Sequence, residues 1–294
     1  MPKRTEFEEW IYNEIESQKG LYVPVTASIF ERLLITKLPC DKIHPNPEDE
    51  FCFPEIGPSF RIISNYVNEF RENVQNGYPA IKEPLMVGKV HPSGYMLING
   101  HHRWAAAMKS GFKTVPVKII NMTTPADIRR MIENSKHDKR VTMDLDEVVL
   151  RDANDPYIEK VPGLRGGGKN NKRMRLGIPA LFRHFNTHGY DIWVYSANYY
   201  SIDDVQRYFR HYSVNVDGII VGTAKKKVSE SEAEKNMAKL IANKYGQTVH
   251  IDNDMVLVTH GGSGDFDEIA IEATGSDWSK EIIEKSKSFV KTEE

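Results

Sequence analysis

The chain of 294 residues contains only two cysteines, Cys40 and Cys52. Two thiols cannot build a disulfide framework, and their spacing matches none of the usual zinc-binding patterns. Reduced thiols are typical of cytoplasmic proteins. The sequence has no apolar run long enough to cross a membrane, and its first residues, MPKRTEFEEWIYNEI, have the pattern of an amphipathic helix rather than a signal peptide. We therefore expect a cytoplasmic protein without a membrane partner.

The sequence also lacks a strong net charge, because 39 Lys and Arg residues stand against 41 Asp and Glu residues, a balance of −2. Overall basicity therefore does not indicate a nucleic-acid-binding protein. Local charge is less even, since KNNKRMR at 169–175 and KKK at 225–227 are basic. We find no internal repeat and no low-complexity segment. A length of 294 residues is sufficient for two domains, each with its own core.

The hydrophobic pattern divides the chain into four segments. Residues 1–35 predict a helical extension, residues 36–122 a small domain of mixed strands and helices, and residues 123–139 a helical linker. In residues 140–294, short apolar runs alternate with amphipathic segments of helical length. Strands separated by such helices indicate a parallel sheet with crossover connections. We predict an α/β protein, in which a small mixed α+β domain is followed by a Rossmann-like parallel-sheet domain.

Polar side chains follow each of the four apolar runs that predict parallel strands in the second half. In strand order they are Asp144 with Asp146, Ser196, the lysines at 225–227, and Asp252 with Asp254. The carboxyl ends of parallel strands share one crevice, so we expect these side chains to meet there. Carboxylates this close repel one another, and Mg²⁺, which prefers oxygen ligands, would remove the repulsion. Lysine and serine can hold phosphate oxygens, so this edge predicts metal-dependent phosphoryl transfer.

The motifs DLDEV, VYSAN, a downstream lysine and IDND occur in this order over residues 141–254. They are similar to the four motifs of the haloacid dehalogenase (HAD) superfamily of phosphatases. The resemblance implies that Asp144 is the nucleophile and a Mg²⁺ ligand. It implies that Asp146 is the general acid and base, and that its backbone carbonyl also binds the metal. An acid at this second position favours phosphate-ester hydrolysis over dehalogenation.

The same resemblance assigns the remaining motif residues. Ser196 would bind the phosphoryl group, and Asp252 and Asp254 would complete the metal shell directly or through water. The motif lysine is Lys225, Lys226 or Lys227, and we favour Lys225 because it is nearest to the predicted strand end.

The segment between the first predicted strand and the first long helix, residues 150–176, is too short for a large folded cap. Its glycine-rich stretch, GLRGGGKNNKR, indicates a loop with positive charge. An open, basic site suits a large phosphorylated substrate such as a nucleic-acid end. A small hydroxylated metabolite stays as the alternative.

In the first half, the stretch YMLINGHHRWAAAMKSGFKTVPVKII at 95–120 predicts a strand that runs into Gly100, followed by a helix. The glycine permits a tight turn, and the N–H groups at the start of the helix form an anion site. Arg103 can bind phosphate through two hydrogen bonds, and His101 or His102 can add donors or transfer a proton. We predict a phosphate-binding site over Gly100–Arg103.

This stretch resembles the ParB/sulfiredoxin-like nucleotide-binding fold over residues 36–122, with LPCDKIHPNPEDE as its opening strand and GFKTVPVKII as its closing segment. The closest resemblance is to members typified by free serine kinases, whose motif reads Asp-Gly-(His/Thr)-His-Arg-Trp; Asn99 replaces the aspartate here. Sulfiredoxins have cysteine at the position of His101, and chromosome-partitioning ParB proteins have Glu-Arg-Arg after the glycine. The resemblance implies binding of ATP or another nucleoside triphosphate, and Glu48 or Glu50 of PEDEF could be the base of a kinase.

Two hypotheses for the whole protein follow. In the first, a Mg²⁺-dependent phosphohydrolase is joined to a domain that binds a nucleoside triphosphate and can act as a kinase. Such a pair suits the repair of nucleic-acid ends or the interconversion of a small metabolite. In the second, the protein is a nucleotide-gated, DNA-associated or regulatory binding protein, and its phosphatase fold is degenerate.

Overall fold

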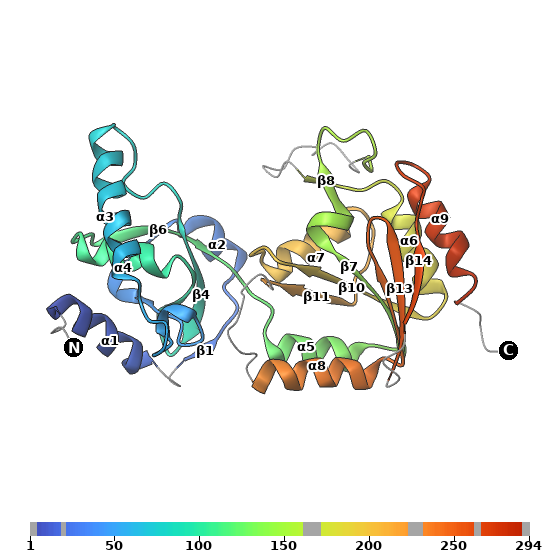
Figure 1. Ribbon diagram of the computed structural model, residues 1–294, viewed down its shortest axis with the longest axis horizontal. Helices are drawn as coiled ribbons and strands as arrows, with labels where there is room; N and C mark the ends of the chain where they lie inside the picture. Colours follow the sequence, from blue (N-terminus) through green and yellow to red (C-terminus); the bar gives the residue numbers. More distant parts are fainter. Residues whose placement is uncertain (1–4, 19–21, 161–171, 223–231, 262–265, 290–294) are drawn as a thin grey trace. The chain divides into compact units, whose positions relative to one another are not determined.

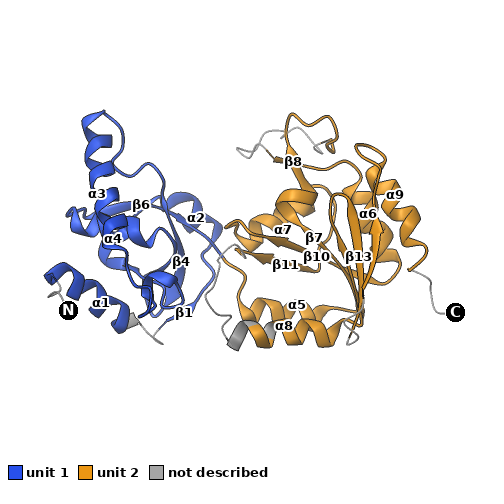
Figure 2. Cartoon of the chain, in the orientation of Figure 1, with its two compact units in different colours: residues 1–121 blue, residues 122–294 orange. Residues whose placement is uncertain are grey.

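The chain folds into two compact units, residues 1–121 and 122–294, each with its own hydrophobic core (Figure 2). The computed structural model describes residues 5–18, 22–160, 172–222, 232–261 and 266–289. None of the helices in these ranges is long and apolar enough to span a bilayer.

Unit 1 is a mixed sheet with helices packed against it (Figure 1). Its strands are β1 (Val23–Pro24), β2 (Lys37–Pro39), β3 (Ile43–His44), β4 (Leu85–His91), β5 (Tyr95–Asn99) and β6 (Thr114–Ile119). Its helices are α1 (Glu6–Gln18), α2 (Ile29–Leu34), α3 (Phe60–Gln75) and α4 (His101–Lys109), with 3-10 turns at Cys40–Lys42 and Glu50–Cys52. The strand order is β2-β6-β4-β5-β3, and β1 pairs with β4. This mixed α+β arrangement agrees with the prediction for the first half.

The N-terminal helix α1 belongs to the core of unit 1. Ile11 and Ile15 are buried in the same cluster as Trp104 of α4. Residues 1–35, predicted as an extension, therefore contribute to the packing of this unit. The small side chains of Ala105–Ala107 let helix α4 pack closely against its neighbours, and all three are completely buried.

Unit 2 contains a six-stranded sheet, a two-stranded hairpin and helices. Its strands are β7 (Lys139–Asp144), β8 (Leu150–Asp152), β9 (Lys172–Met174), β10 (Tyr190–Ser196), β11 (Gly218–Val221), β12 (Gln247–Ile251), β13 (Met255–His260) and β14 (Phe266–Ala270). Its helices are α5 (Pro125–Asn134), α6 (Ile178–Thr187), α7 (Ile202–His211), α8 (Glu232–Lys244) and α9 (Trp278–Ser286), and a π-helical turn spans Leu145–Val149.

The strand order of the large sheet is β11-β10-β7-β12-β13-β14, and β11, β10, β7 and β12 run parallel. The four strands that the sequence predicts to be parallel do run parallel, but the sheet as a whole is mixed. Two further strands, which the sequence prediction does not include as parallel strands, extend it, since β13 pairs antiparallel with β12 and β14 antiparallel with β13. The physical reason is the connection. Residues 252–254 form a short turn, and a parallel crossover needs a dozen or more residues.

The two faces of this sheet are covered differently. On one face, Val141 and Met143 of β7 belong to the main core, which also contains residues of α6, α7 and α9. On the other face, Trp193 packs with Ile128 of α5 and Ile241 of α8. Helices α5 and α8 lie side by side against this face (Figure 1). Helix α5, which the sequence predicts to be part of a linker, is thus a packed layer of unit 2.

Candidate functional site

Three of the predicted site residues lie at the carboxyl edge of the parallel strands. Strand β7 ends at Asp144, β10 ends at Ser196, and Asp252 directly follows β12. The strand register places Tyr195 beside Asp144 and Ile251 beside Met143, so these strand ends are level with one another. The parallel pairing therefore brings the three polar residues to one edge of the sheet.

Asp144 caps the π-helical turn that follows β7. Its Oδ1 accepts hydrogen bonds from the backbone N–H groups of Asp146 at 2.7 Å and Glu147 at 2.8 Å. Within the ranges that the structure describes, its Oδ2 has no hydrogen-bond partner. Short π-helical segments are frequent at functional sites. One oxygen of Asp144 is thus fixed by the backbone, and the other remains available to a ligand.

Asp146 lies next to Ser196 and Tyr200. The Ser196 hydroxyl donates to its Oδ2 and the Tyr200 hydroxyl to its Oδ1, each at 2.6 Å. Burial, together with the nearby Asp146 carboxylate, raises the pKa of Tyr200 far above its ordinary value, so this hydroxyl remains a donor. The sequence predicts Asp146 and Ser196 for this site but misses Tyr200, which lies four residues beyond the strand end in a loop.

The turn between β12 and β13 is organised around Asn253. The Asp252 Oδ1 accepts a hydrogen bond from Asn253 N at 2.6 Å. The side-chain oxygen of Asn253 accepts from Arg151 Nη2 at 2.7 Å and from Arg175 Nη1 at 2.9 Å. Asp254 is exposed. These two arginines, which come from the β8–β9 hairpin, are a part of the site that the sequence does not reveal.

Arg175 is held rigidly in this position. Its guanidinium lies 3.5 Å from the centre of the Trp278 ring, a short cation–π contact. Burial, and then repulsion from Arg151, lower the pKa of Arg175 to about 10, and the Asp155 carboxylate opposes this shift only weakly. The lowered pKa still leaves the guanidinium charged at neutral pH.

The predicted magnesium ligands do not form a ready-made cage. No three His, Cys, Asp or Glu residues of the described chain are grouped so that they could hold a metal ion. The donor chemistry nevertheless fits Mg²⁺, because this ion is usually held by one or two carboxylates together with water and substrate phosphates. The second oxygen of Asp144 would be such a carboxylate ligand.

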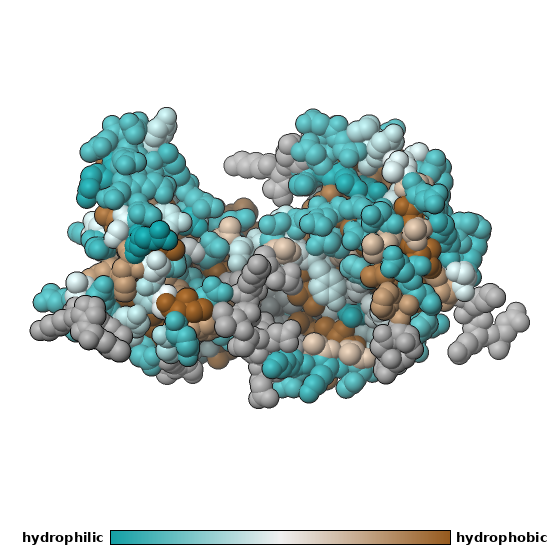
Figure 3. Space-filling view, in the orientation of Figure 1, coloured by the Kyte–Doolittle hydropathy of each residue, from teal (hydrophilic) through white to brown (hydrophobic). Residues whose placement is uncertain are grey.

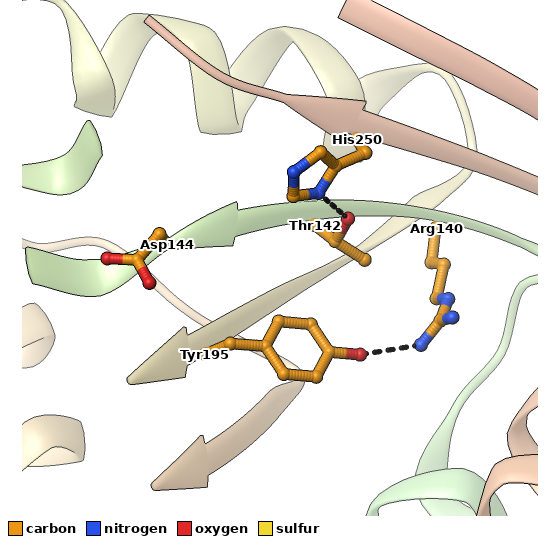
Figure 4. Close-up of a pocket in the computed structure, with 5 residues that line it drawn as sticks. All are labelled: Arg140, Thr142, Asp144, Tyr195 and His250. Atoms are coloured by element: carbon orange, nitrogen blue, oxygen red, sulfur yellow. Dashed lines mark hydrogen bonds between the residues drawn. The ribbon is translucent and has the colours of Figure 1, made fainter. Parts of the chain in front are cut away.

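A cavity of about 310 Å³ reaches Asp144 along the second face of the sheet (Figure 4). Its lining residues are Arg140, Thr142, Asp144, Tyr195 and His250. Alternate residues of a strand point to one face, so the three residues of β7 lie in a row. Arg140 Nη1 donates to the Tyr195 hydroxyl at 2.8 Å, and Thr142 Oγ1 and His250 Nδ1 are 2.9 Å apart. The cavity thus presents polar groups among the carbon surfaces of these side chains.

Two predicted parts of the site fall outside the described residues. These are the candidate lysines Lys225, Lys226 and Lys227, and most of the glycine-rich loop, residues 163–171.

In unit 1, Gly100 leads from β5 into α4 with φ 99° and ψ 26°. A Cβ atom at this position would lie 2.7 Å from Leu85 Cδ2, so both the backbone conformation and the space require glycine. Because Gly100 has no side chain, it does not cap the helix. The first N–H groups of α4 can therefore bind an anion.

The two histidines that follow hold a neighbouring loop. His101 Nε2 accepts a hydrogen bond from Asn46 N, and His102 Nε2 accepts one from Ser59 N, each at 3.1 Å. Burial lowers the pKa of His102, which keeps its ring neutral and able to accept. The structure thus gives both rings a loop-positioning role, and their phosphate-binding role stays a prediction.

Arg103 is buried and already engaged. Its Nη1 donates to the Glu83 carbonyl oxygen at 2.7 Å and contacts the Glu83 carboxylate at 2.6 Å, while its Nη2 donates to Asn99 Oδ1 at 3.0 Å. Asn99, which replaces an aspartate of the kinase motif, therefore orients this arginine.

Glu48 and Glu50, the predicted kinase bases, are exposed in the segment before α3, Glu50 as the first residue of a 3-10 turn. The carboxylate that approaches the motif is that of Asp49, whose Oδ1 lies 3.5 Å from His101 Nδ1. The sequence prediction misses Asp49, although the acidic run PEDE contains it.

Residues 31–135 match the family described as the ParB N-terminal domain. This segment is therefore similar to a ParB N-terminal domain. It extends from α2 through the sheet and α4 of unit 1 to α5 of unit 2. No curated protein matches the chain.

Three solved structures are similar to parts of the chain. The first is the C-terminally truncated chromosome-partitioning protein ParB from Caulobacter crescentus complexed with CTP-gamma-S, at 24% identity and TM-score 0.25 over 34% of this chain. The match spans about half, 52%, of that ParB chain.

The second is a conserved hypothetical protein from Pyrococcus furiosus, at 12% identity and TM-score 0.22 over 90% of this chain and 88% of that one. The third is a mutant free serine kinase in complex with AMP, at 14% identity and TM-score 0.23 over 85% of this chain and 81% of that one.

Proposed function

We propose that unit 2 is a phosphohydrolase in which Asp144 accepts the phosphoryl group, and that unit 1 binds a nucleoside triphosphate. One observation carries the first part. Asp144 presents an oxygen without a partner among the described residues, beside an Asp146 carboxylate that Ser196 and Tyr200 hold in place. The resemblance of the motifs over 141–254 to the HAD superfamily supports the same assignment.

The reaction takes two steps on these residues. In the first, an Asp144 oxygen attacks phosphorus while the bond to the ester oxygen breaks, and Asp146, which enters this step protonated, gives its proton to that leaving oxygen. An alcohol leaves, and an aspartyl phosphate remains. In the second, Asp146 takes a proton from a water molecule whose oxygen attacks phosphorus. The bond to Asp144 breaks, and inorganic phosphate is released.

Asp144 and Asp252, with Asp254 and the Asp146 carbonyl, are the residues that would hold Mg²⁺. The ion would supply positive charge against the phosphoryl oxygens. Ser196 and Lys225 are the proposed phosphoryl-binding side chains. In the structure, the Ser196 hydroxyl donates to Asp146, so it would have to divide its hydrogen bonding between that carboxylate and the substrate.

The test is hydrolysis of 4-nitrophenyl phosphate by the full chain with Mg²⁺. We expect activity that EDTA abolishes, that Asp144→Asn removes, and that Asp146→Asn lowers by about 10²–10⁴-fold, the usual contribution of a general acid. Asp277→Asn, at an exposed carboxylate that directly precedes α9, is the matched control. Activity that survives in Asp144→Asn would contradict the proposal.

The proposed nucleotide site of unit 1 rests on the ParB N-terminal domain and on the uncapped start of α4. The ParB/sulfiredoxin-like resemblance implies that the phosphates bind at Gly100–Arg103. Calorimetric titration with ATP and CTP tests this. Gly100→Ala should abolish binding because its Cβ collides with Leu85, whereas Gly111→Ala, which has no atom within 4 Å, should retain it. Equal affinity in both variants would reject the site.

Kinase activity is a further part of this proposal, with a nucleic-acid end or a small hydroxylated metabolite as acceptor. Labelled ATP with serine or a 5′-hydroxyl oligonucleotide tests it directly. Glu48→Gln and Glu50→Gln test the predicted bases, and Asp49→Asn tests the carboxylate that faces His101.

A regulatory, nucleotide-gated binding protein is the second candidate. One observation favours it, since no three potential metal ligands of the described chain form a group. Nucleotide binding without hydrolysis of any phosphate ester would select this function.

A further inference from the structure

Two arginines converge on one neutral acceptor in unit 2. Arg151 and Arg175 both donate to the side-chain oxygen of Asn253, at 2.7 Å and 2.9 Å. Neither forms an ion pair with a carboxylate of the described residues. Two guanidinium groups that share an uncharged amide repel each other, and an amide oxygen offsets that repulsion only in part.

Burial makes this arrangement more costly. Arg175 is only 6% exposed, and the Trp278 ring covers one side of its guanidinium. A buried charge without a counter-ion in contact loses hydration that the Asn253 amide and the Trp278 ring replace only in part. The pair is therefore arranged to receive an anion that the described chain does not supply.

The arginine pair lies on the hairpin that follows the Asp144 turn in the chain. Arg151 lies on β8 and Arg175 directly follows β9, in the hairpin that begins where the π-helical turn ends. Asn253 lies between the two predicted metal ligands of the β12–β13 turn, and its Nδ2 donates to the Glu147 carbonyl oxygen at 3.4 Å. Figure 1 shows β8 beyond the end of β7, and Figure 3 shows mainly hydrophilic side chains over that end of unit 2.

We propose that Arg151 and Arg175 bind a second phosphate group of the substrate, one that is not transferred. This inference rests on the proposed phosphohydrolase and narrows its substrate class to esters with at least two phosphate groups. Each guanidinium carries five N–H donors in a planar fork that matches phosphate oxygens, and Asn253 takes one from each. The second phosphate can come from a polynucleotide backbone or from a bisphosphorylated metabolite.

Three substrates separate these sources: 4-nitrophenyl phosphate with one phosphate, thymidine 3′,5′-bisphosphate, and a decathymidylate with a 3′-phosphate. Arg151→Gln should raise KM about ten-fold or more for a substrate whose second phosphate is bound, the effect of one lost hydrogen bond between charged groups. The kcat for that substrate should stay the same, and so should both kcat and KM for 4-nitrophenyl phosphate. The substrate that shows the KM effect identifies the source.

Two further variants make the test specific. Arg151→Lys, which keeps the charge, should recover part of the affinity. Arg207→Gln, which removes a half-exposed arginine that pairs with Asp203 and Asp204 of its own helix, should behave like the wild type. Arg151 rather than the buried Arg175 carries the test, because Arg151→Gln leaves the core intact. A KM increase of equal size for all three substrates, or none for any, overturns the inference.

Failure of the proposed hydrolysis would be seen separately. If the wild type hydrolyses none of the three substrates, calorimetric binding of inorganic pyrophosphate to the full chain still tests the arginine pair. Weaker binding by Arg151→Gln, but not by Arg207→Gln, supports an anion site without hydrolysis. Equal binding by both variants overturns the site as well.

Discussion

At the scale of single residues, both oxygens of the Asp146 carboxylate have hydrogen-bond partners. The carboxylate accepts one hydrogen bond from Ser196 and one from Tyr200. Tyr200→Phe removes the second bond and leaves the ring in place. We expect kcat for 4-nitrophenyl phosphate to fall by about 10- to 100-fold, because a hydrogen bond to a charged group is lost from the proposed acid and base.

Tyr199→Phe is the control for this variant. Tyr199 is the preceding residue, and no described group forms a hydrogen bond with its hydroxyl, so its removal should leave kcat unchanged. Equal rates in the wild type and Tyr200→Phe would show that this tyrosine does not position Asp146.

His102 gives a second prediction at this scale, concerning pH. Burial lowers the pKa of its ring below the ordinary 6.5, and the Asp49 carboxylate opposes this shift. The unfolded chain therefore takes up the proton first as the pH falls, so the free energy of unfolding is highest above pH 7 and declines as the pH passes below about 6.5. His102→Gln can still accept from Ser59 N but does not titrate.

Urea unfolding at about pH 7.5 and about pH 5.5 measures this effect. The wild type should lose more stability between the two pH values than His102→Gln does. His91→Gln, at an exposed position, should lose as much as the wild type. The same loss in all three proteins would contradict the prediction.

Some site residues could be predicted from the sequence and others could not. Asp144, Ser196 and Asp252 follow apolar runs directly, so the geometry of a parallel sheet places them at one edge. Tyr200 and Arg175 reach the site through loop and hairpin conformations. No short-range pattern encodes those conformations.

At the scale of elements, the start of α6 depends on the absence of a side chain. Gly177 has φ 91°, and a Cβ there would lie 1.9 Å from Ser279 Oγ of α9. We expect Gly177→Ala to lower the free energy of unfolding of unit 2 by about 2–4 kcal/mol, because it adds overpacking to a strained backbone.

Gly189→Ala separates these two causes. Gly189 also has a positive φ, 78°, but the nearest atom to an added Cβ is His137 Cδ2 at 3.8 Å. Its cost should be that of the backbone alone, about 1–2 kcal/mol. Urea unfolding followed by tryptophan fluorescence compares the two variants, and equal losses would rule out the α6–α9 collision.

The elements also show where sequence prediction fails. Strands β7, β10, β11 and β12 are predictable from the sequence because segments with helical spacing separate them. These segments form α6, α7 and α8. The direction of β13 depends on the length of the turn before it, and the apolar pattern of MVLVTH carries no such information. The π-helical turn is equally hidden, because it depends on the capping carboxylate of Asp144.

At the scale of the whole molecule, the two units have separate cores and a short junction. The Asn121 side chain exchanges two hydrogen bonds of 2.9 Å with the backbone of Ala27, in unit 1. The Thr123 hydroxyl bonds to the Ile219 carbonyl oxygen and to Val221 N, in unit 2. The chain therefore divides at Met122, the residue at which the sequence analysis ends the first domain, and the segment 123–139 belongs to unit 2.

This boundary leads to a prediction about fragments. Residues 122–294 should unfold cooperatively, and residues 136–294 should be less stable because removal of α5 exposes Trp193 and Ile241. Thermal unfolding followed by circular dichroism compares the two fragments. Equal midpoints would show that α5 does not stabilise unit 2. That result would instead group α5 with the ParB N-terminal domain match, which ends at residue 135.

Strand β14 forms one margin of the large sheet, with a described neighbour on its β13 side only. Open strand margins can recruit a further strand from another molecule and so begin aggregation. Asp267 and Glu268 are both exposed on this strand. Two copies meeting there would bring like charges together, so acid or concentrated salt, which weakens that repulsion, should favour self-association of the protein.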